Sequence, residues 1–245
     1  MLTFTNNSRS PRSFNILQWN CCGVRNKFSQ LQSICKNTIS SAFSRIASLS
    51  FISKFFLRGF HIIREDIANP GLRGVCILIR HNIVFSIIDL SDLRDNSVEM
   101  LGVEVSSDNG KFTIVNIYRH PNCNTPAQFY DDLMRFGDSK GKCIFVGDFN
   151  AYHASVEDHY ACILNDERPT LLLSPNSGPS VIDLVIATAD MAPLCKACTE
   201  EDTWGSDHYP ITIIIGISPI LRQRYTYKIN LETSEGIPKR PRSFV

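Results

Sequence analysis

Short runs of apolar residues, many of them β-branched, recur along the chain and are separated by turn-forming residues. Runs of this length and composition predict β-strands. The predicted strands cover 14–20 (FNILQWN), 74–80 (GVCILIR), 83–90 (IVFSIIDL), 97–106 (SVEMLGVEVS), 111–119 (KFTIVNIYR), 142–150 (KCIFVGDFN), 181–187 (VIDLVIA) and 209–217 (YPITIIIGI). Because only turn sequences such as HN, SDLRD and SSDNG separate the four runs between 74 and 119, we expect these strands to be antiparallel neighbours.

Two other segments carry apolar residues at helical spacing, namely KFSQLQSICKN (27–37) and PAQFYDDLMRFGD (126–138). Strands interspersed with helices favour an α/β or α+β sandwich. A chain of 245 residues with 43% hydrophobic content can bury a full core. We expect one domain over 14–217, preceded by a tail (1–13) and followed by a charged, proline-containing, linker-like tail (218–245).

Charge is distributed unevenly, although the net charge is only +1. The first acidic residue is Glu65 and nine Lys and Arg residues precede it, so the remainder of the chain has a net charge of −8. A basic half suits binding to a polyanion, and an acidic half suits divalent cations. An acid-free N-terminus rich in Arg and Ser also resembles a transit peptide, but the strand predicted within it argues against targeting.

The nine cysteines are odd in number and irregularly spaced, and no apolar signal segment precedes them. This usage indicates a reducing intracellular compartment rather than a disulfide framework. Cys195 and Cys198 form a CxxC sequence, but no second Cys or His pair stands at zinc-site spacing. We therefore interpret this pair as a packing feature rather than a metal site.

Several predicted strands end in polar residues of the types found in catalytic sites. A carboxylate at the tip of a buried strand needs a metal, a cation or a reaction to offset its desolvation. The residues are Asn20, Tyr118, Asp148, Asn150, Asp183, Ser206, Asp207 and His208. Any one alone could be a turn cap. Together they predict convergence on one rim of a sandwich, where carboxylates, amides, a tyrosine and a histidine suit magnesium-assisted attack on a phosphodiester.

Six sequence blocks carry a family resemblance: QWNCCGVRNK, GVCILIR, IVNIYRHPN, FVGDFNAYH, SPNSGPSVIDLVIATADMA and DTWGSDHYPI. In this order they resemble the endonuclease/exonuclease/phosphatase superfamily, specifically the apurinic-type endonuclease domain of jockey-like non-LTR retrotransposons. The resemblance covers most of 14–217 and implies a four-layer α/β/β/α sandwich of two mixed β-sheets. It also implies a nuclear, Mg²⁺-dependent endonuclease that nicks DNA to leave a 3′-hydroxyl for priming reverse transcription.

The resemblance assigns catalytic roles to matching residues. His208, oriented by Asp183, would contact the scissile phosphate and stabilise its developing negative charge. Asp148 would orient or deprotonate the attacking water. Asn150 would hold the phosphate and the water in line.

The metal and phosphate contacts follow from the same resemblance. Asn20 and Asp207 would lie near the Mg²⁺, and Asn20 and Tyr118 would also contact phosphate oxygens. His120 and His153 lie close to these blocks in sequence, and we expect them to be surface residues of the rim rather than catalytic groups.

The sequence departs from the family after the first helix. There the family carries a strand ending in Gln-Glu-Thr, whose glutamate is the principal Mg²⁺ ligand. Its slot falls in the divergent segment 37–57, and no acid precedes Glu65. We interpret this segment as a scrambled or mis-spliced remnant of the strand, and the alternative is a basic amphipathic helix that could bind a membrane surface. A membrane-spanning segment is not expected because Arg45 and Lys54 interrupt the apolar residues.

A second departure follows GDFNAYHASV, where only a few residues precede ILNDERPT. A family helix is therefore expected to be missing. Three functions remain open: an Mg²⁺-dependent DNA endonuclease by descent, impaired by the missing glutamate; a catalytically dead nucleic-acid-binding remnant; and a membrane-active or organelle-targeted protein. The order of the six blocks argues against the third, and no small-molecule cofactor is expected.

Overall fold

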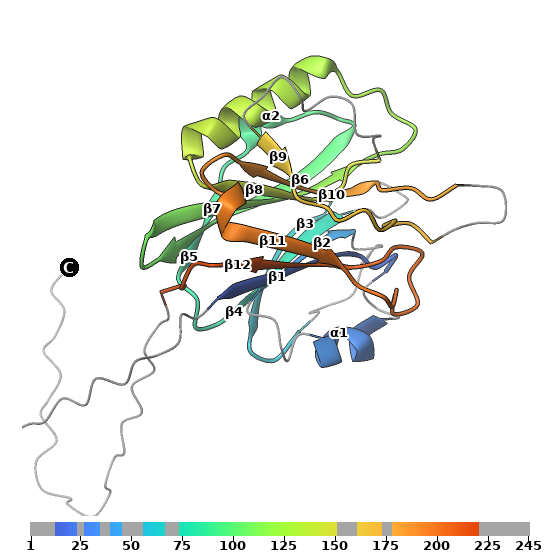
Figure 1. Ribbon diagram of the computed structural model, residues 1–245, viewed down its shortest axis with the longest axis horizontal. Helices are drawn as coiled ribbons and strands as arrows, with labels where there is room; N and C mark the ends of the chain where they lie inside the picture. The colour runs from blue at the N-terminus through green and yellow to red at the C-terminus, as the bar shows by residue number, and fades with distance from the viewer. Residues whose placement is uncertain are drawn as a thin grey trace, which may run out of the picture.

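The computed structural model of the protein describes residues 13–23, 27–34, 40–45, 56–66, 74–150, 161–172 and 178–220. Over these ranges the chain forms two stacked sheets of six strands each (Figure 1). The first sheet has the order β11-β12-β1-β2-β4-β3 and contains β1 (Phe14–Asn20), β2 (Ser40–Arg45), β3 (Phe60–Asp66), β4 (Gly74–Arg80), β11 (Cys195–Thr199) and β12 (Ile211–Ile215).

The second sheet has the order β5-β6-β7-β8-β10-β9. It contains β5 (Phe85–Ile88), β6 (Val98–Ser107), β7 (Gly110–Arg119), β8 (Cys143–Asp148), β9 (Ala161–Ile163) and β10 (Asp183–Thr188). Two α-helices, α1 (Phe28–Ile34) and α2 (Ala127–Lys140), and two 3-10 turns, Ser91–Leu93 and Ala192–Leu194, complete the described elements. Both sheets are mixed, because β1 and β2 are parallel, β7 and β8 are parallel, and the other pairings are antiparallel.

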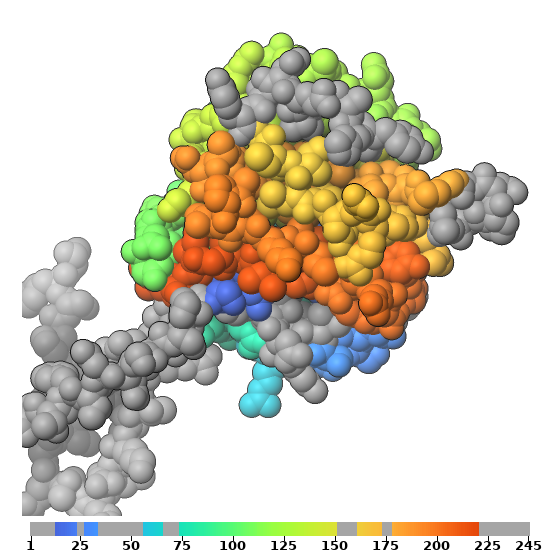
Figure 2. All heavy atoms as spheres, viewed as in Figure 1, coloured from blue at the N-terminus to red at the C-terminus, as the bar shows by residue number. Residues whose placement is uncertain are grey.

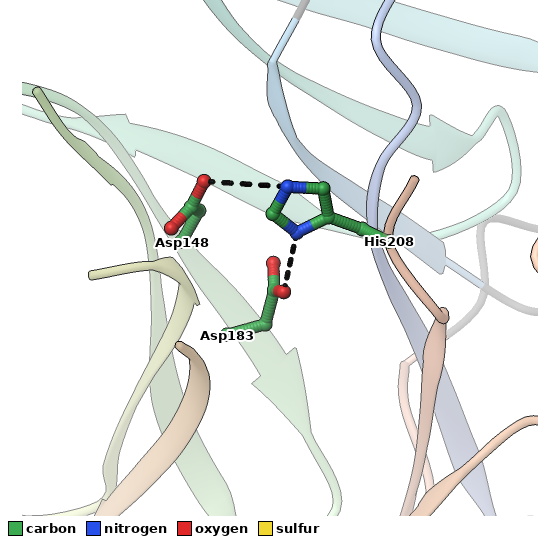
Figure 3. A group of neighbouring side chains, drawn as sticks. All are labelled: Asp148, Asp183 and His208. Carbon is green, nitrogen blue, oxygen red and sulfur yellow. Dashed lines mark hydrogen bonds and ion pairs between the residues drawn. The ribbon is translucent and has the colours of Figure 1, made fainter. Parts of the chain in front are cut away.

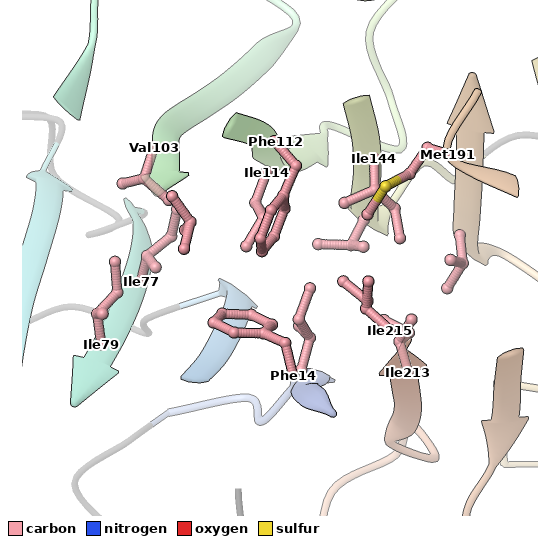
Figure 4. Packing of buried hydrophobic residues seen from close by; sticks show 14 of the residues in the cluster. Phe14, Ile77, Ile79, Val103, Phe112, Ile114, Ile144, Met191, Ile213 and Ile215 are labelled. Atoms are coloured by element: carbon pink, nitrogen blue, oxygen red, sulfur yellow. The ribbon is translucent and has the colours of Figure 1, made fainter. Parts of the chain in front are cut away.

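Apolar side chains fill the space between the two sheets (Figure 4). Phe14 of β1 meets Phe112 of β7 edge-on, with 5.1 Å between the ring centroids. A second apolar cluster lies between α2 and the outer face of the second sheet, and a third lies between α1 and the first sheet. The layers are therefore α2, second sheet, first sheet and α1, which confirms the α/β/β/α sandwich.

The alternation of side chains along each strand decides what lies at the rim of the sandwich. Ile16 of β1, Val146 of β8 and Val185 of β10 all belong to the core between the sheets. Residues separated by an even number of positions share a face of a strand. The polar side chains of Asn20, Asp148 and Asp183 therefore lie at the ends of these strands on the face between the sheets.

The glycine of the sequence FVGDFN lies where two strands approach each other closely. Gly147 of β8 has a φ of +144°, and a Cβ there would lie 1.9 Å from the carbonyl oxygen of Ile117 in β7. No larger residue fits without moving the β7 backbone. Gly147 thus lets β8 run close beside β7 immediately before Asp148.

The structure decides between the alternatives for part of the divergent segment. Residues Ser40–Arg45 form β2, which runs parallel to β1 and antiparallel to β4. The amphipathic-helix alternative is therefore wrong for these residues, because their backbone hydrogen-bonds belong to the ladders of two neighbouring strands. Residues 46–55 lie outside the described ranges. Over the described part of the chain, no helix has the length and apolarity needed to cross a membrane.

The expectation that the four strands between 74 and 119 are antiparallel neighbours is wrong for β4, which pairs with β2 and β3 in the first sheet, and is confirmed for β5, β6 and β7. Boundaries also differ from the prediction. Strands β3, β9 and β11 were not predicted, and the strand predicted over 83–90 is only four residues long. Residues 218–220 still contact the sandwich: Ile220 donates a backbone hydrogen bond to Ser106, and its carbonyl accepts one from Val84. The rest of the predicted tail, 221–245, and residues 151–160, where a helix was expected to be missing, lie outside the described ranges, so both predictions stay open.

Candidate active site at the rim of the two sheets

The central contact of the candidate site joins His208 and Asp183 (Figure 3). Nδ1 of His208 lies 2.7 Å from Oδ2 of Asp183, the first residue of β10. His208 lies in the loop before β12, and its backbone forms an isolated β-bridge with Leu171. Both residues are buried, with exposures of 5% for His208 and 0% for Asp183. The expected pairing of these two residues is confirmed.

Asp183 is held from two other elements as well. The side-chain amide of Gln18 in β1 donates to Oδ1 of Asp183 at 3.0 Å. The backbone N–H of Asp183 donates to the hydroxyl of Thr170 at 3.0 Å. Because both carboxylate oxygens already accept hydrogen bonds, the side chain has one orientation and fixes the proton of His208 on Nδ1.

Asn20 connects this pair to the second carboxylate. Its Nδ2 lies 2.9 Å from Oδ2 of Asp148 and 3.2 Å from Nε2 of His208. The hydroxyl of Ser206 donates to the carbonyl oxygen of Asn20 at 2.6 Å and accepts the backbone N–H of His208 at 3.2 Å. The Ser-Asp-His turn is thereby attached to the end of β1, and one network joins both sheets.

The pKa values of two groups in this network are raised. Burial, reinforced by the charge of Asp183, raises the pKa of Asp148 from 3.8 to about 7. Burial alone lowers the pKa of His208, but the negative charges of Asp183, Asp148 and Asp207 outweigh it and raise the pKa from 6.5 to about 9. At neutral pH the imidazole is therefore cationic. Its Nε2 lies 3.9 Å from Oδ1 of Asp207 and 4.0 Å from Oδ2 of Asp148.

Asn150 lies next to this network and is fixed by reciprocal contacts with Arg119. It has a left-handed backbone with a φ of 43°, and its N–H donates to Oδ1 of Asp148 at 3.0 Å. Its Nδ2 donates to the carbonyl of Arg119 at 2.8 Å, and Nη1 of Arg119 donates to the carbonyl of Asn150 at 2.7 Å. Asn150 therefore orients Asp148 in this structure, and its amide nitrogen already has a partner.

Tyr118 lies beside Asp148 in the parallel register of β7 and β8 and is buried, with an exposure of 3%. Its ring meets the ring of His120 edge-on at 5.2 Å. The expectation that His120 is a surface residue is wrong: it is 5% exposed, and its Nε2 lies 3.2 Å from Oε1 of the buried Glu99. A buried imidazole and a buried carboxyl are each costly alone, and their pairing explains the burial of both. His153 lies outside the described residues.

The residues that would hold Mg²⁺ form a weak set of ligands. Of the two residues expected near the Mg²⁺, Asn20 is fully buried, and the carboxylate of Asp207 is the exposed oxygen donor. Oδ1 of Asp207 accepts the thiol of Cys22 at 2.6 Å. The β2 residue in register with Asn20 is Arg45. Mg²⁺ requires a near-octahedral set of oxygen ligands, so one carboxylate beside a thiol does not fit it.

A second group of ligand-type atoms does not change this conclusion. One atom each of Asp148, Asp183 and His208 lies within 4.8 Å of the others. All three residues are buried, and their facing atoms already share hydrogen bonds with one another, with Asn20 or with Gln18. This group is a hydrogen-bonded proton network rather than a metal centre.

Several residues of the site were not predicted. Gln18 could have been found, because it stands two residues before Asn20 and so shares its face of β1. Thr170, Arg119 and Cys22 carry no such periodic signal, since each acts from a loop or a strand end through contacts distant in sequence.

The CxxC sequence is not a paired site. Cys195 and Cys198 lie three positions apart on β11, so their side chains point to opposite faces of the strand. Nη2 of Arg168 donates to the sulfur of Cys198 at 2.8 Å. The eight cysteines of the described ranges are free thiols.

Two stacked mixed sheets with outer helices form a fold shared with known nucleases, and an Asp–His pair lies at one rim. Residues 112–212 match the family described as endonuclease-reverse transcriptase. Among solved structures, the chain is similar to the endonuclease domain of TRAS1, a telomere-specific non-LTR retrotransposon. The two are 19% identical with a TM-score of 0.65, over 83% of this chain and 98% of that chain.

Two further solved structures share the fold. The 3′ phosphatase NExo from Neisseria, bound to a product DNA hairpin, is 16% identical with a TM-score of 0.57, over 82% of this chain and 99% of that one. TDP2 from D. rerio, complexed with a single-strand DNA product, is 14% identical with a TM-score of 0.54, over 82% and 98%. No curated protein sequence matches the chain. The resemblance to a non-LTR retrotransposon endonuclease, stated from the sequence, is confirmed.

Proposed function

We propose that the protein is a DNA-binding domain descended from a retrotransposon endonuclease, with the proton-transfer half of a phosphodiesterase site intact and the Mg²⁺-binding half degraded. The observation that carries the proposal is the cluster at the rim in which His208 pairs with Asp183, Asn20 donates to Asp148, and the Asn20 amide lies beside the imidazole. Such a network has the groups needed to activate water and to stabilise charge on a phosphate.

Each member of the network has a role that its geometry supports. The cationic His208, held by Asp183, would donate Nε2–H to a phosphate oxygen and stabilise charge that develops there. Asp148, whose pKa is about 7, would take a proton from water at neutral pH. Asn20 donates to Asp148 and lies against the imidazole, so it would keep the base and the cation in fixed positions.

Two further residues would complete phosphate contact. Tyr118 lies beside Asp148 in register, and Asn150 orients Asp148 through its backbone N–H. We infer that a substrate phosphate is held between these residues and His208. In the family Mg²⁺ supplies further neutralisation of phosphate charge, but the described residues at this rim offer no fitting ligand set, so none of the steps proposed for them depends on the ion.

DNA is the proposed partner. The fold neighbours from Neisseria and D. rerio carry product DNA in their structures. The nine Lys and Arg residues that precede the first acidic residue, Glu65, suit binding to a polyanion. By the same ancestry, the proposed location is the nucleus and the proposed ancestral reaction is a nick that primes reverse transcription.

A second candidate is DNA binding without any cleavage. Arg45 favours it, because the β2 residue in register with Asn20 is basic rather than acidic. The two candidate functions differ only in whether the bound DNA is cleaved.

The test is a nicking assay on supercoiled plasmid across Mg²⁺ concentrations, combined with fluorescence anisotropy of labelled duplex DNA. We expect salt-dependent binding and weak or no nicking, and any residual nicking should disappear in Asp148→Ala. Robust nicking that Asp148→Ala abolishes would show that the metal-binding half is intact. Absence of DNA binding at low salt would overturn both candidates.

A further inference from the structure

A second carboxylate–imidazole pair lies at the rim of the sandwich and takes no part in the chemistry proposed above. Nε2 of His120 lies 3.2 Å from Oε1 of Glu99, and both side chains are buried. Burial of such a pair adds little net stability, because the cost of taking the two groups out of water offsets much of their attraction. The stability of the fold alone therefore does not account for the pair.

The register of the second sheet places this pair beside the candidate site. Glu99 of β6 is in register with Tyr118 of β7. Tyr118 is in register with Asp148 of β8, which is in register with Asp183 of β10. Residues in register on neighbouring strands share a face of the sheet, so these four side chains form one row across the rim. Within the row, Tyr118 stands between Glu99 and the carboxylates of the candidate site.

His120 contacts the tyrosine directly. It follows Tyr118 by two positions, and the two rings meet edge-on, with 5.2 Å between their centroids and 87° between their planes. The backbone N–H of His120 donates to the carbonyl of Ser97 at 2.8 Å, which continues the pairing of β6 and β7 beyond the last residue of β7. The main chain thus fixes the position of His120, and its contact with Glu99 restrains the rotation of the imidazole. Tyr118 is 3% exposed, so the angle of its ring depends on such neighbours.

We propose that Glu99 and His120 are positioning residues for Tyr118. The role rests on the proposed function, in which Tyr118 contacts a substrate phosphate. The carboxylate holds the imidazole, and the imidazole holds the tyrosine ring at the angle at which its hydroxyl meets a phosphate oxygen of DNA. Neither positioning residue touches the DNA. Their effect on DNA affinity therefore passes through the hydroxyl of Tyr118 and should disappear when this hydroxyl is removed.

The experiment is a double-mutant cycle in which fluorescence anisotropy measures the affinity of the full chain for labelled duplex DNA. Tyr118→Phe removes only the hydroxyl and should weaken binding about three- to tenfold in the wild-type chain. In the Glu99→Gln chain, the same substitution should weaken binding by less than about twofold. Glu99→Gln also removes a negative charge, which strengthens DNA binding with or without the hydroxyl. The informative quantity is therefore the change in the effect of Tyr118→Phe.

The matched control is Glu104→Gln, which removes a carboxylate of the same strand that is paired with Lys111. It should leave the effect of Tyr118→Phe unchanged. Circular dichroism checks the fold of each variant. If Glu99→Gln unfolds, His120→Phe tests the same coupling, because it keeps a ring beside Tyr118 and removes the contact with Glu99.

The outcomes separate this inference from the proposed function. If Tyr118→Phe keeps its full effect in both the Glu99→Gln chain and the His120→Phe chain, the positioning role is wrong and the proposed function stands. A wild-type chain that binds no DNA would overturn the proposed function and the positioning role together. DNA binding that Tyr118→Phe leaves unchanged would show that the tyrosine makes no phosphate contact, and would overturn the positioning role.

Discussion

The imidazole of His208 is charged because three carboxylates surround it. Burial opposes the cation, but the nearest carboxylate, Asp183, also accepts its Nδ1–H at 2.7 Å. The pKa of His208 therefore reports directly on this contact. Removing the charge while keeping the shape of the partner should lower it.

We predict that Asp183→Asn lowers the pKa of His208 from its raised value of about 9 toward the ordinary range. The measurement is an NMR titration of the His208 ring protons in the two proteins. Asp190→Asn, which removes an exposed acid just beyond β10, is the matched control and should leave the titration unchanged. An identical His208 titration in the wild type and in Asp183→Asn would contradict the pairing.

The raised pKa values also set the pH dependence of stability. A group that binds its proton more tightly in the folded state loses its stabilising contribution as pH rises through the folded pKa. For Asp148 the loss falls between 3.8 and about 7, and for His208 between 6.5 and about 9. Carboxyls with lowered pKa values, such as Asp166 and Asp207, act in the opposite sense but only around and below pH 4.

We therefore predict that the free energy of unfolding falls between pH 5 and pH 9. Asp148→Asn mimics the neutral carboxyl, so its stability relative to the wild type should improve as pH rises from about 4 to 7. Urea unfolding at a series of pH values measures both trends. If the difference in free energy of unfolding between the two proteins stayed constant from pH 4 to pH 7, the pKa of Asp148 would not be raised in the folded protein.

At the scale of elements, one arginine connects the ends of two strands. Arg119 at the end of β7 donates from Nε to Thr125, from Nη1 to the carbonyl of Asn150 and from Nη2 to the carbonyl of Cys123. All three nitrogens are used in a planar fork that a lysine cannot reproduce. The arginine thus fixes the loop before α2 and the turn after β8, which orients Asp148.

We predict that Arg119→Ala lowers the free energy of unfolding by about 1–3 kcal/mol, and that Arg119→Lys recovers only a small part of this loss. Urea unfolding at pH 7 measures the effect. The control is Arg135→Ala, which removes an arginine whose single ion pair lies on the exposed face of α2 and should cost less than about 0.5 kcal/mol. Equal effects at the two positions would mean that the three bonds of Arg119 add nothing.

Strand β2 forms part of the divergent segment. It runs parallel to β1, and Arg45 is in register with Asn20. Replacing residues 37–57 with a family-like strand ending in Gln-Glu-Thr should restore Mg²⁺ affinity and rescue nicking only in part. Calorimetry with Mg²⁺ and the plasmid assay test the two effects. A graft that folds and still binds no Mg²⁺ would place the defect elsewhere.

At the scale of the whole molecule, the sandwich and the converging strand ends could be predicted because most of the buried strands are continuous apolar runs in the sequence. Strands β1, β4 and β7 were found within one residue of their bounds. Strands β3 and β11 are less regular in pattern, and β11 is largely exposed on one face, so neither carries a clear apolar signal. β2 was ambiguous because its short, Ser-rich sequence fits a strand only when β1 and β4 pair with it.

Part of the candidate site could also be predicted from the sequence, namely the residues at the ends of apolar strands. Residues that end apolar strands, such as Asn20, Asp148 and Asp183, stand out locally. Arg119 and Cys22 matter only through partners that are distant in sequence, and no local pattern encodes such contacts.

The pairing of β12 with β1 places segments from the two ends of the described chain side by side (Figure 2). The contact of Asn20 with His208 spans 188 positions of sequence. Because synthesis starts at the N-terminus, His208 is made only after nearly all of the domain, so its contact with Asn20 forms late. A product that ends before His208 would lack β12 as well as the histidine of the site, and Ile211, Ile213 and Ile215 of β12 belong to the core between the sheets. Premature termination would therefore remove the site and leave the apolar face of the second sheet partly uncovered.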